Sequence, residues 1–180
     1  LEDAFDEEEK YRNVRSRIIR IIGRIGGDQA VAILKKKVDS VDETVRNLIL
    51  NSLVMCKYQA GDSERPLVRE KIRYEVKDAA WTLSVLLDIG DYKNAEKLTE
   101  ALRNEFRKNR QKVWLLLAMI YPTDTILSAQ RNLESKLKEK IASSLEAMDN
   151  LLDSDRELKS IVFPLVDDIT LAQCRSRLIA

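Results

Sequence analysis

The chain contains no histidine, and this absence restricts its possible chemistry strongly. Ser–His and Cys–His nucleophile pairs need an imidazole as general base, and His-ligated metal sites need it as a ligand. The two cysteines, Cys56 and Cys174, fit no metal or redox spacing, and each lies among apolar residues at helical spacing. We expect both to be reduced core or near-core residues, as in a cytoplasmic protein.

Nucleotide-binding and metal-binding motifs are also lacking. The segment GRIGGD, residues 23–28, has too few properly spaced glycines for a dinucleotide fingerprint, and no Gly-Lys-Ser/Thr follows for a P-loop. It is typical of a helix end and a turn. Asp167 and Asp168 could bind a hard cation, but a pair in this position more often caps the next helix. The sequence therefore predicts no enzyme, no cofactor and no metal.

Apolar runs are short. The most apolar segment, VWLLLAMIY at residues 113–121, has nine residues, whereas a membrane span needs about 20. The acidic N-terminal segment, LEDAFDEEEK, differs from the basic start of a signal peptide. The chain does not begin with methionine, so we expect it to be a fragment of a longer protein. The apolar run is predicted to form the core of a helical protein.

Neither sign of charge is in excess, since 31 basic residues stand against 30 acidic ones. Binding to nucleic-acid phosphates favours a basic surplus. Tyr74, Trp81, Trp114 and Tyr121 could stack on bases, as in helical-repeat DNA glycosylases. At helical spacing among leucines and valines, such residues more often belong to the core. A helical-repeat enzyme acting on nucleic acid is therefore the less favoured alternative.

Only five glycines and three prolines occur, and their positions predict where helices end. Pro122, for example, excludes the helical conformation at Tyr121. Asp28, Asp42 and Asp91 are predicted to cap helices. No alternating strand pattern is found, so the predicted fold class is all-α. The helices are predicted at about residues 7–25, 28–38, 42–60, 63–89, 91–121, 123–133, 137–152, 156–166 and 170–178.

A short sequence repeat also occurs within these predicted helices. Val14-Arg15, Val45-Arg46 and Val76-Lys77 recur every 31 residues, which suggests a solenoid in which neighbouring helix pairs share one core. The segment VRSRIIRIIGRIGGDQAVAILKK resembles HEAT repeats. Within it, Ile18, Ile21, Ile22 and Ile25 form one apolar stripe of an amphipathic helix. We expect residues 1–180 to form a single HEAT-like domain of stacked antiparallel helix pairs, with nine or ten helices.

The C-terminal 75 residues carry a narrower resemblance. The segments LLLAMIYPTDTI, LSAQRNLES, LEAMDNLL and VFPLVDD resemble the cytoplasmic HEAT-like segment that follows an ADP/ATP-translocase-like membrane domain in certain bacterial proteins. The matching residues are Leu116, Leu117, Tyr121, Pro122, Asp124, Ile126, Leu133, Leu145, Glu146, Asp149, Asn150, Leu151, Leu152, Pro164, Leu165 and Asp167.

This resemblance implies a non-catalytic regulatory or connecting module on the cytoplasmic side of a membrane, tethered through a transporter-like domain of its parent chain. In that family a cyclic-nucleotide-binding domain often follows. The implied partners are adjacent domains of the parent chain or another protein. A free-standing protein–protein scaffold adaptor is the alternative.

One basic segment, RNEFRKNRQK at residues 103–112, holds five basic residues and one acidic residue. Such a run is usually a solvated helix face, and otherwise a docking surface for an acidic protein or an anionic membrane. The candidate binding residues are Arg103, Arg107, Lys108, Arg110 and Lys112.

Overall fold

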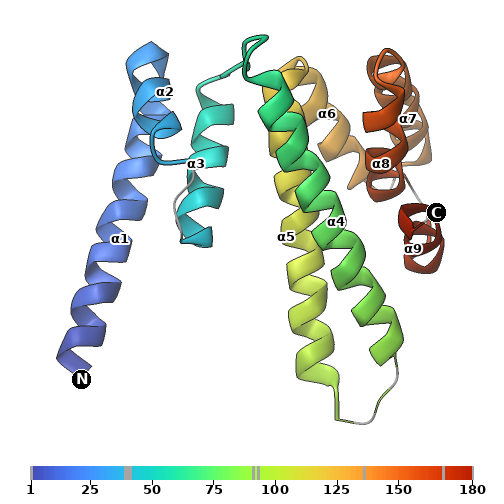
Figure 1. Ribbon diagram of the computed structural model, residues 1–180, viewed down its shortest axis with the longest axis horizontal. Helices are drawn as coiled ribbons and strands as arrows, with labels where there is room; N and C mark the ends of the chain where they lie inside the picture. The colour runs from blue at the N-terminus through green and yellow to red at the C-terminus, as the bar shows by residue number, and fades with distance from the viewer. Residues whose placement is uncertain are drawn as a thin grey trace. The chain divides into compact units, whose positions relative to one another are not determined.

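A computed structural model describes residues 2–38, 42–90, 92, 94–135, 137–167 and 169–179, without the side chains of residues 2–10, 12 and 179. Nine helices and no strand are found in these residues (Figure 1), which confirms the all-α class. The helices are α1 (Glu2–Ile25), α2 (Gly27–Lys35), α3 (Glu43–Met55), α4 (Arg65–Ile89), α5 (Glu96–Ile120), α6 (Thr123–Leu133), α7 (Lys138–Leu152), α8 (Arg156–Val166) and α9 (Leu171–Ile179).

The chain divides into two compact units, unit 1 (Leu1–Gln59) and unit 2 (Ala60–Ala180). Unit 1 contains α1, α2 and α3, and each of these helices contacts the other two. The turn between α1 and α2 is made by Gly26 and Gly27, whose φ angles of 68° and 79° lie in the region that favours glycine. The predicted helix end at this glycine pair is confirmed.

The helix caps of unit 1 were predicted with mixed success. The Asp42 side chain accepts hydrogen bonds from the backbone N–H groups of Thr44 and Val45, so it caps α3 as expected. Asp28 was predicted to cap α2, and this is wrong. The N-cap residue is Gly26, and Asp28 lies in the first turn without a side-chain capping bond. A carboxylate in the first turn is still favoured by the positive end of the helix dipole.

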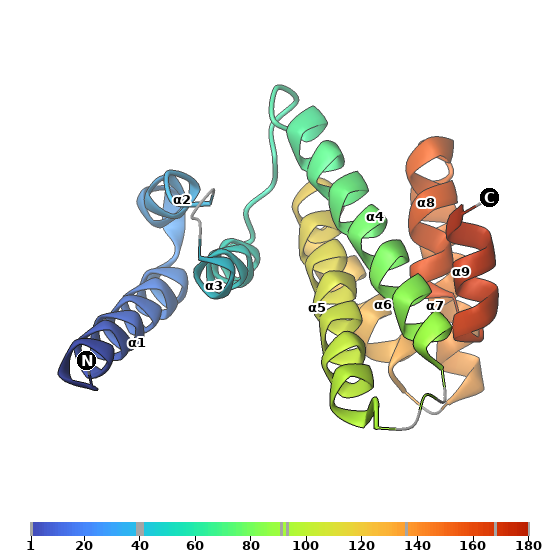
Figure 2. The ribbon, with the colours of Figure 1, turned by 60° about the horizontal axis from the view of Figure 1, so that its bottom comes forward.

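Unit 2 is built on α4 and α5, two long antiparallel helices that lie side by side (Figures 1 and 2). All eight residues from Val113 to Ile120 are buried, which confirms that the apolar run is core. The run can be apolar on every side because other elements surround it: α4 and α6 pack on α5, and the Ala60 N–H donates to the Met119 carbonyl oxygen at 2.7 Å. Tyr121 is extended before Pro122, with φ −124° and ψ 165°, as expected.

Helices distant in sequence also meet in unit 2. The helices α6, α7, α8 and α9 each contact the next, while α4 contacts α8 and α9 directly (Figure 2). In a solenoid, each repeat contacts only its neighbours. The three positions of the 31-residue repeat also differ in burial, because Val14 is exposed whereas Val45 and Val76 are buried. The stacked arrangement of helix pairs therefore stays a prediction, as does the single domain.

Two aromatic residues predicted to be core are not. Trp81 and Tyr74 are 65% and 68% exposed, on the outer side of α4. Trp114 is buried, and Tyr121 is half-buried. Periodicity places Tyr74 and Trp81 on one face, seven residues apart, but it does not tell whether another helix covers that face. The predicted cap Asp91 lies outside the described residues.

Candidate interaction surface

No cluster of three His, Cys, Asp or Glu side chains with metal-binding geometry is found within the described residues. Asp167 ends α8 and accepts a hydrogen bond from Arg177 of α9 at 2.7 Å, while Asp168 lies outside the described part. Across the described helices, none has the length and apolar character needed to cross a membrane.

A reciprocal cap precedes α9. The Thr170 N–H and hydroxyl both donate to Gln173 Oε1 at 3.0 Å, and the Gln173 N–H donates to Thr170 Oγ1 at 3.3 Å. This is a capping box, and the sequence signal Thr-x-x-Gln could have predicted it. Thr170 and Gln173 therefore cap the start of α9.

The predicted basic surface is only partly present. Arg103 and Arg107 are exposed on α5, and exposed Lys108 forms an ion pair with Glu105 at 3.0 Å. Lys112 is buried, with 8% of its surface exposed, and its Nζ lies 3.2 Å from Glu75 Oε2 of α4. A five-residue surface including Lys112 is therefore wrong.

Arg110 also leaves that surface. Its side chain is half-buried in unit 2, where desolvation by burial lowers its pKa, against smaller raising effects of Cys174 and Glu134. Helical spacing groups Arg103, Arg107 and Arg110 on one face, but only Arg103 and Arg107 are exposed, whereas Arg110 is half-buried. The remaining exposed cations of the segment are Arg103, Arg107 and Lys108.

The buried part of the segment instead joins α4 to α5. Lys112 Nζ donates to Asn109 Oδ1 at 3.4 Å, and Asn109 Nδ2 donates to Asp78 Oδ2 at 2.9 Å. With the Lys112–Glu75 ion pair, these bonds form a polar network inside an apolar interface. A buried charge needs such partners, so this network has a structural role.

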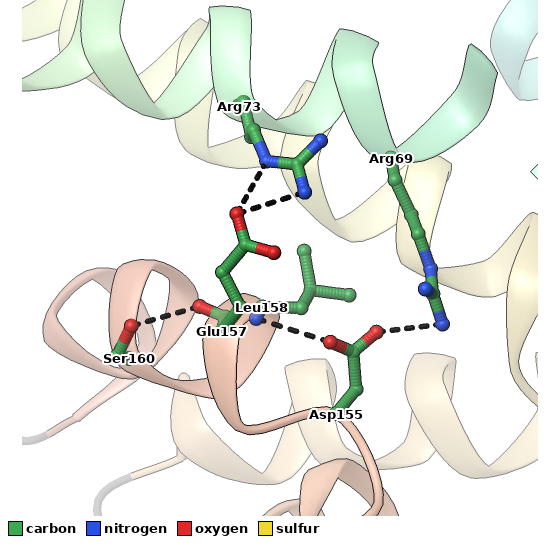
Figure 3. Close-up of polar contacts among 6 residues, drawn as sticks. All are labelled: Arg69, Arg73, Asp155, Glu157, Leu158 and Ser160. Carbon is green, nitrogen blue, oxygen red and sulfur yellow. Dashed lines mark hydrogen bonds and ion pairs between the residues drawn. The ribbon is translucent and has the colours of Figure 1, made fainter. Parts of the chain in front are cut away.

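A second polar cluster joins α4 to α8 (Figure 3). Asp155 accepts a hydrogen bond from the Leu158 N–H at 3.3 Å and lies 2.7 Å from Arg69 Nη2, so one carboxylate caps α8 and pairs with α4. Arg73 and Glu157 pair at 2.9 Å nearby, but both are exposed. We attribute the anchoring mainly to Asp155, since exposed ion pairs contribute little to stability.

Unit 1 contains an apolar groove between its three helices, with a volume of about 470 Å³. We call it the unit 1 groove. Ile18 and Ile33 at its edge are each 51% exposed. The buried lining residues are Ile19, Leu34, Val45 and Ile49. Its lining residues are Arg15, Ile18, Ile19, Ile22, Ile33, Leu34, Lys37, Val45 and Ile49.

An apolar row on α1 continues the groove outward. Its members alternate at spacings of three and four residues, so they lie on one helix face. All are exposed, from 47% at Val14 to 76% at Ile25. We call this row the α1 stripe: Tyr11, Val14, Ile18, Ile21 and Ile25. The stripe predicted from the sequence shares Ile18, Ile21 and Ile25 with this row but includes Ile22 in place of Tyr11 and Val14. The sequence does not show that the row is exposed.

The stripe and groove lie in a basic part of the chain. From Arg12 to Lys37 there are eight Lys and Arg residues, and Asp28 is the only acidic residue. Arg15 and Lys37 are exposed at the groove. Arg17 and Arg24 are exposed, each next in sequence to a stripe residue. The overall net charge of +1 conceals this local surplus.

Comparisons with protein-family models, curated proteins and solved structures find no match for this chain. The resemblance to the segment beside translocase-like membrane domains thus rests on the C-terminal residues alone and stays a prediction. The proposal for function is therefore based on the exposed surfaces of the described residues.

Proposed function

We propose that this chain is a non-catalytic protein-interaction module that binds its partner through the unit 1 groove and the α1 stripe. The single observation that carries this proposal is the uncovered row of apolar side chains beside an apolar groove. Large contiguous apolar patches are rare on monomeric proteins and mark interaction sites. The lack of histidine in the whole sequence supports a non-catalytic role.

The finer parts of the proposal concern arrangement and context. We infer a HEAT-like stack of helix pairs, supported by the succession of helices joined by short turns. A place beside a transporter-like membrane domain is supported by the C-terminal resemblance around Pro122 and Pro164. Adjacent domains of the parent chain would then be the partners. A free-standing adaptor uses the same surface, and the complete gene distinguishes the two.

The interaction role is tested by photo-crosslinking in cells that express the chain. A photoreactive residue is placed at Ile18, on the α1 stripe, and in a matched variant at Asn13, which is exposed on the same helix away from the stripe. We expect a discrete protein adduct from position 18 and none from position 13. The proposal fails if the two positions give the same adducts or if neither gives one.

A further inference from the structure

We propose that the unit 1 groove and the α1 stripe bind an amphipathic helix of a partner protein, with an apolar row bordered on both sides by Asp or Glu. This inference rests on the proposed function and adds the chemistry of the partner. It follows from three features of unit 1: the shape of the groove, the spacing of the stripe and the position of the charges.

The shape and spacing favour a helix. A groove between helices that continues into a row at three- and four-residue spacing matches the helix-in-groove mode, in which apolar side chains of the partner enter at the same period. From Tyr11 to Ile25, α1 rises about 21 Å at 1.5 Å per residue. A partner helix of about four turns therefore covers the stripe.

The basic residues of unit 1 favour acidic residues on both sides of the partner's apolar row. Arg15 and Lys37 line the groove. Arg17 and Arg24 lie along the edge of the α1 stripe, each directly before one of its isoleucines in the sequence. In coiled-coil terms, the stripe occupies the a and d positions, and Arg15, Arg17 and Arg24 occupy e and g positions. Acidic residues at the matching positions of a partner complement them, whereas basic residues repel them.

A second copy of the chain fits this surface poorly. Two copies of the α1 stripe in contact would place Arg15, Arg17 and Arg24 of both chains along one seam, where like charges repel. The acidic N-terminal residues 2–9 could supply the opposite charge from a second copy. Their only apolar side chains are Ala4 and Phe5, too few to fill an apolar row.

An anionic membrane and a nucleic acid also fit less well. Exposed apolar residues with basic flanks are typical of helices that lie on a membrane. However, α1 continues toward its N-terminus into residues 2–9, of which six are acidic and would be repelled by an anionic surface. A phosphate backbone would neutralise the cations but leave the isoleucines of the stripe uncovered.

The test uses defined peptides and the full chain. The first probe is a fluorescent peptide of three heptads with Leu at a and d and Glu at e and g. The second has Lys in place of Glu, and the third has the Glu peptide's composition in scrambled order. By fluorescence anisotropy, we expect the Glu peptide to bind at least about tenfold more tightly than either other probe, and less tightly as salt increases.

Charge-reversal variants assign this binding to the groove. Arg15→Glu combined with Lys37→Glu should reverse the preference, so that the Lys peptide binds more tightly than the Glu peptide. Ile18→Asp should weaken every peptide by about tenfold or more, because it puts a charge into the apolar contact. The matched control, Arg103→Glu with Arg107→Glu, makes the same charge change on α5 and should leave binding unchanged. Circular dichroism checks that each variant is folded.

Several results would overturn the inference. Equal binding of the Glu and Lys peptides, or of the scrambled peptide, removes the proposed partner chemistry. Dimerisation in sedimentation equilibrium that Ile18→Asp abolishes places a second copy in the groove. Stronger binding to phosphatidylserine vesicles or to duplex DNA than to the Glu peptide, lost in the Arg15/Lys37 double variant, identifies a membrane or a nucleic acid. If crosslinks from position 18 persist while the Glu peptide fails to bind, only this inference fails and the interaction role stands.

Discussion

Gly23 of α1 lies directly against Ser52 of α3, so closely that a β-carbon added to the glycine would be 2.7 Å from the serine Cβ. The Ser52 hydroxyl donates to the Ile19 carbonyl oxygen at 3.2 Å, and the Cys56 thiol donates to the Gly23 carbonyl oxygen at 3.5 Å. The two helices therefore approach to backbone distance at one point. This approach needs a residue without a side chain in α1.

Gly23→Ala should destabilise unit 1. The new methyl group meets the Ser52 Cβ and Cα, which move only if the helices separate. Such overpacking costs about 1–3 kcal/mol. Over most of this range the cost exceeds the roughly 1 kcal/mol that alanine gains over glycine inside a helix. Hydrogen exchange followed by mass spectrometry should show faster exchange of α3 amides in this variant.

Two further variants control that experiment. Gly61→Ala places its methyl group at ordinary van der Waals distance, 3.8 Å from the Glu64 carboxylate, and should change exchange little. Ser52→Gly combined with Gly23→Ala restores the space, so the loss should be smaller than the sum of the two single losses. Additive losses in this cycle would mean that the two residues do not contact each other.

Leu117→Ala should lower the free energy of unfolding by about 2–5 kcal/mol, because Leu117 is fully buried in unit 2 and its truncation leaves a cavity. Chemical denaturation followed by the fluorescence of buried Trp114 measures the change. Leu98→Ala is the matched control, since Leu98 lies on the same helix and is exposed. It should cost less than about 0.5 kcal/mol. Equal losses would contradict the burial of the apolar run.

Lys112→Met should lower the free energy of unfolding, although lysine and methionine have similar volumes. It removes the cation 3.2 Å from the Glu75 carboxylate, whose side chain is only 16% exposed. Breaking a buried ion pair on one side costs about 3–5 kcal/mol, whereas replacing both partners with apolar residues is often neutral. Urea denaturation should therefore show that Lys112→Met with Glu75→Met is more stable than Lys112→Met alone. Lys108→Met, at the exposed Glu105 pair, should have little effect.

Much of the helical division was predictable because it depends on local chemistry. The Gly26-Gly27 turn, the Asp42 cap and the extended Tyr121 before Pro122 are each set by a few neighbouring residues. The nine-residue apolar run was also predictable as core, because too many of its faces are apolar for any exposed helix.

The surfaces were less predictable because they depend on which helices meet. Trp81 and Lys112 both follow helical periodicity, yet the tryptophan is exposed and the lysine is buried. A lysine can be buried when its long side chain reaches a partner such as Glu75 on another helix. The local sequence pattern does not show that partner. The unit 1 groove likewise arises from three helices. The sequence indicates only the apolar face of α1, of which Ile18 and Ile22 line the groove.

Alkaline pH should destabilise the chain partly through Cys174. This thiol is buried in α9, and burial raises its pKa above the usual 9.0, although nearby Arg110 and Arg177 act in the opposite direction. Above pH 9 the unfolded chain loses this proton while the folded chain keeps it, so the folded state binds more protons. The free energy of unfolding should therefore fall as the pH rises from about 9 toward the folded-state pKa, and the full contribution is present below pH 9. Cys174→Ala lacks the group, and its stability should fall less steeply over the same range. Urea denaturation of both proteins between pH 7 and pH 10.5 tests this, and parallel curves would show that the thiol stays exposed to water in the folded chain.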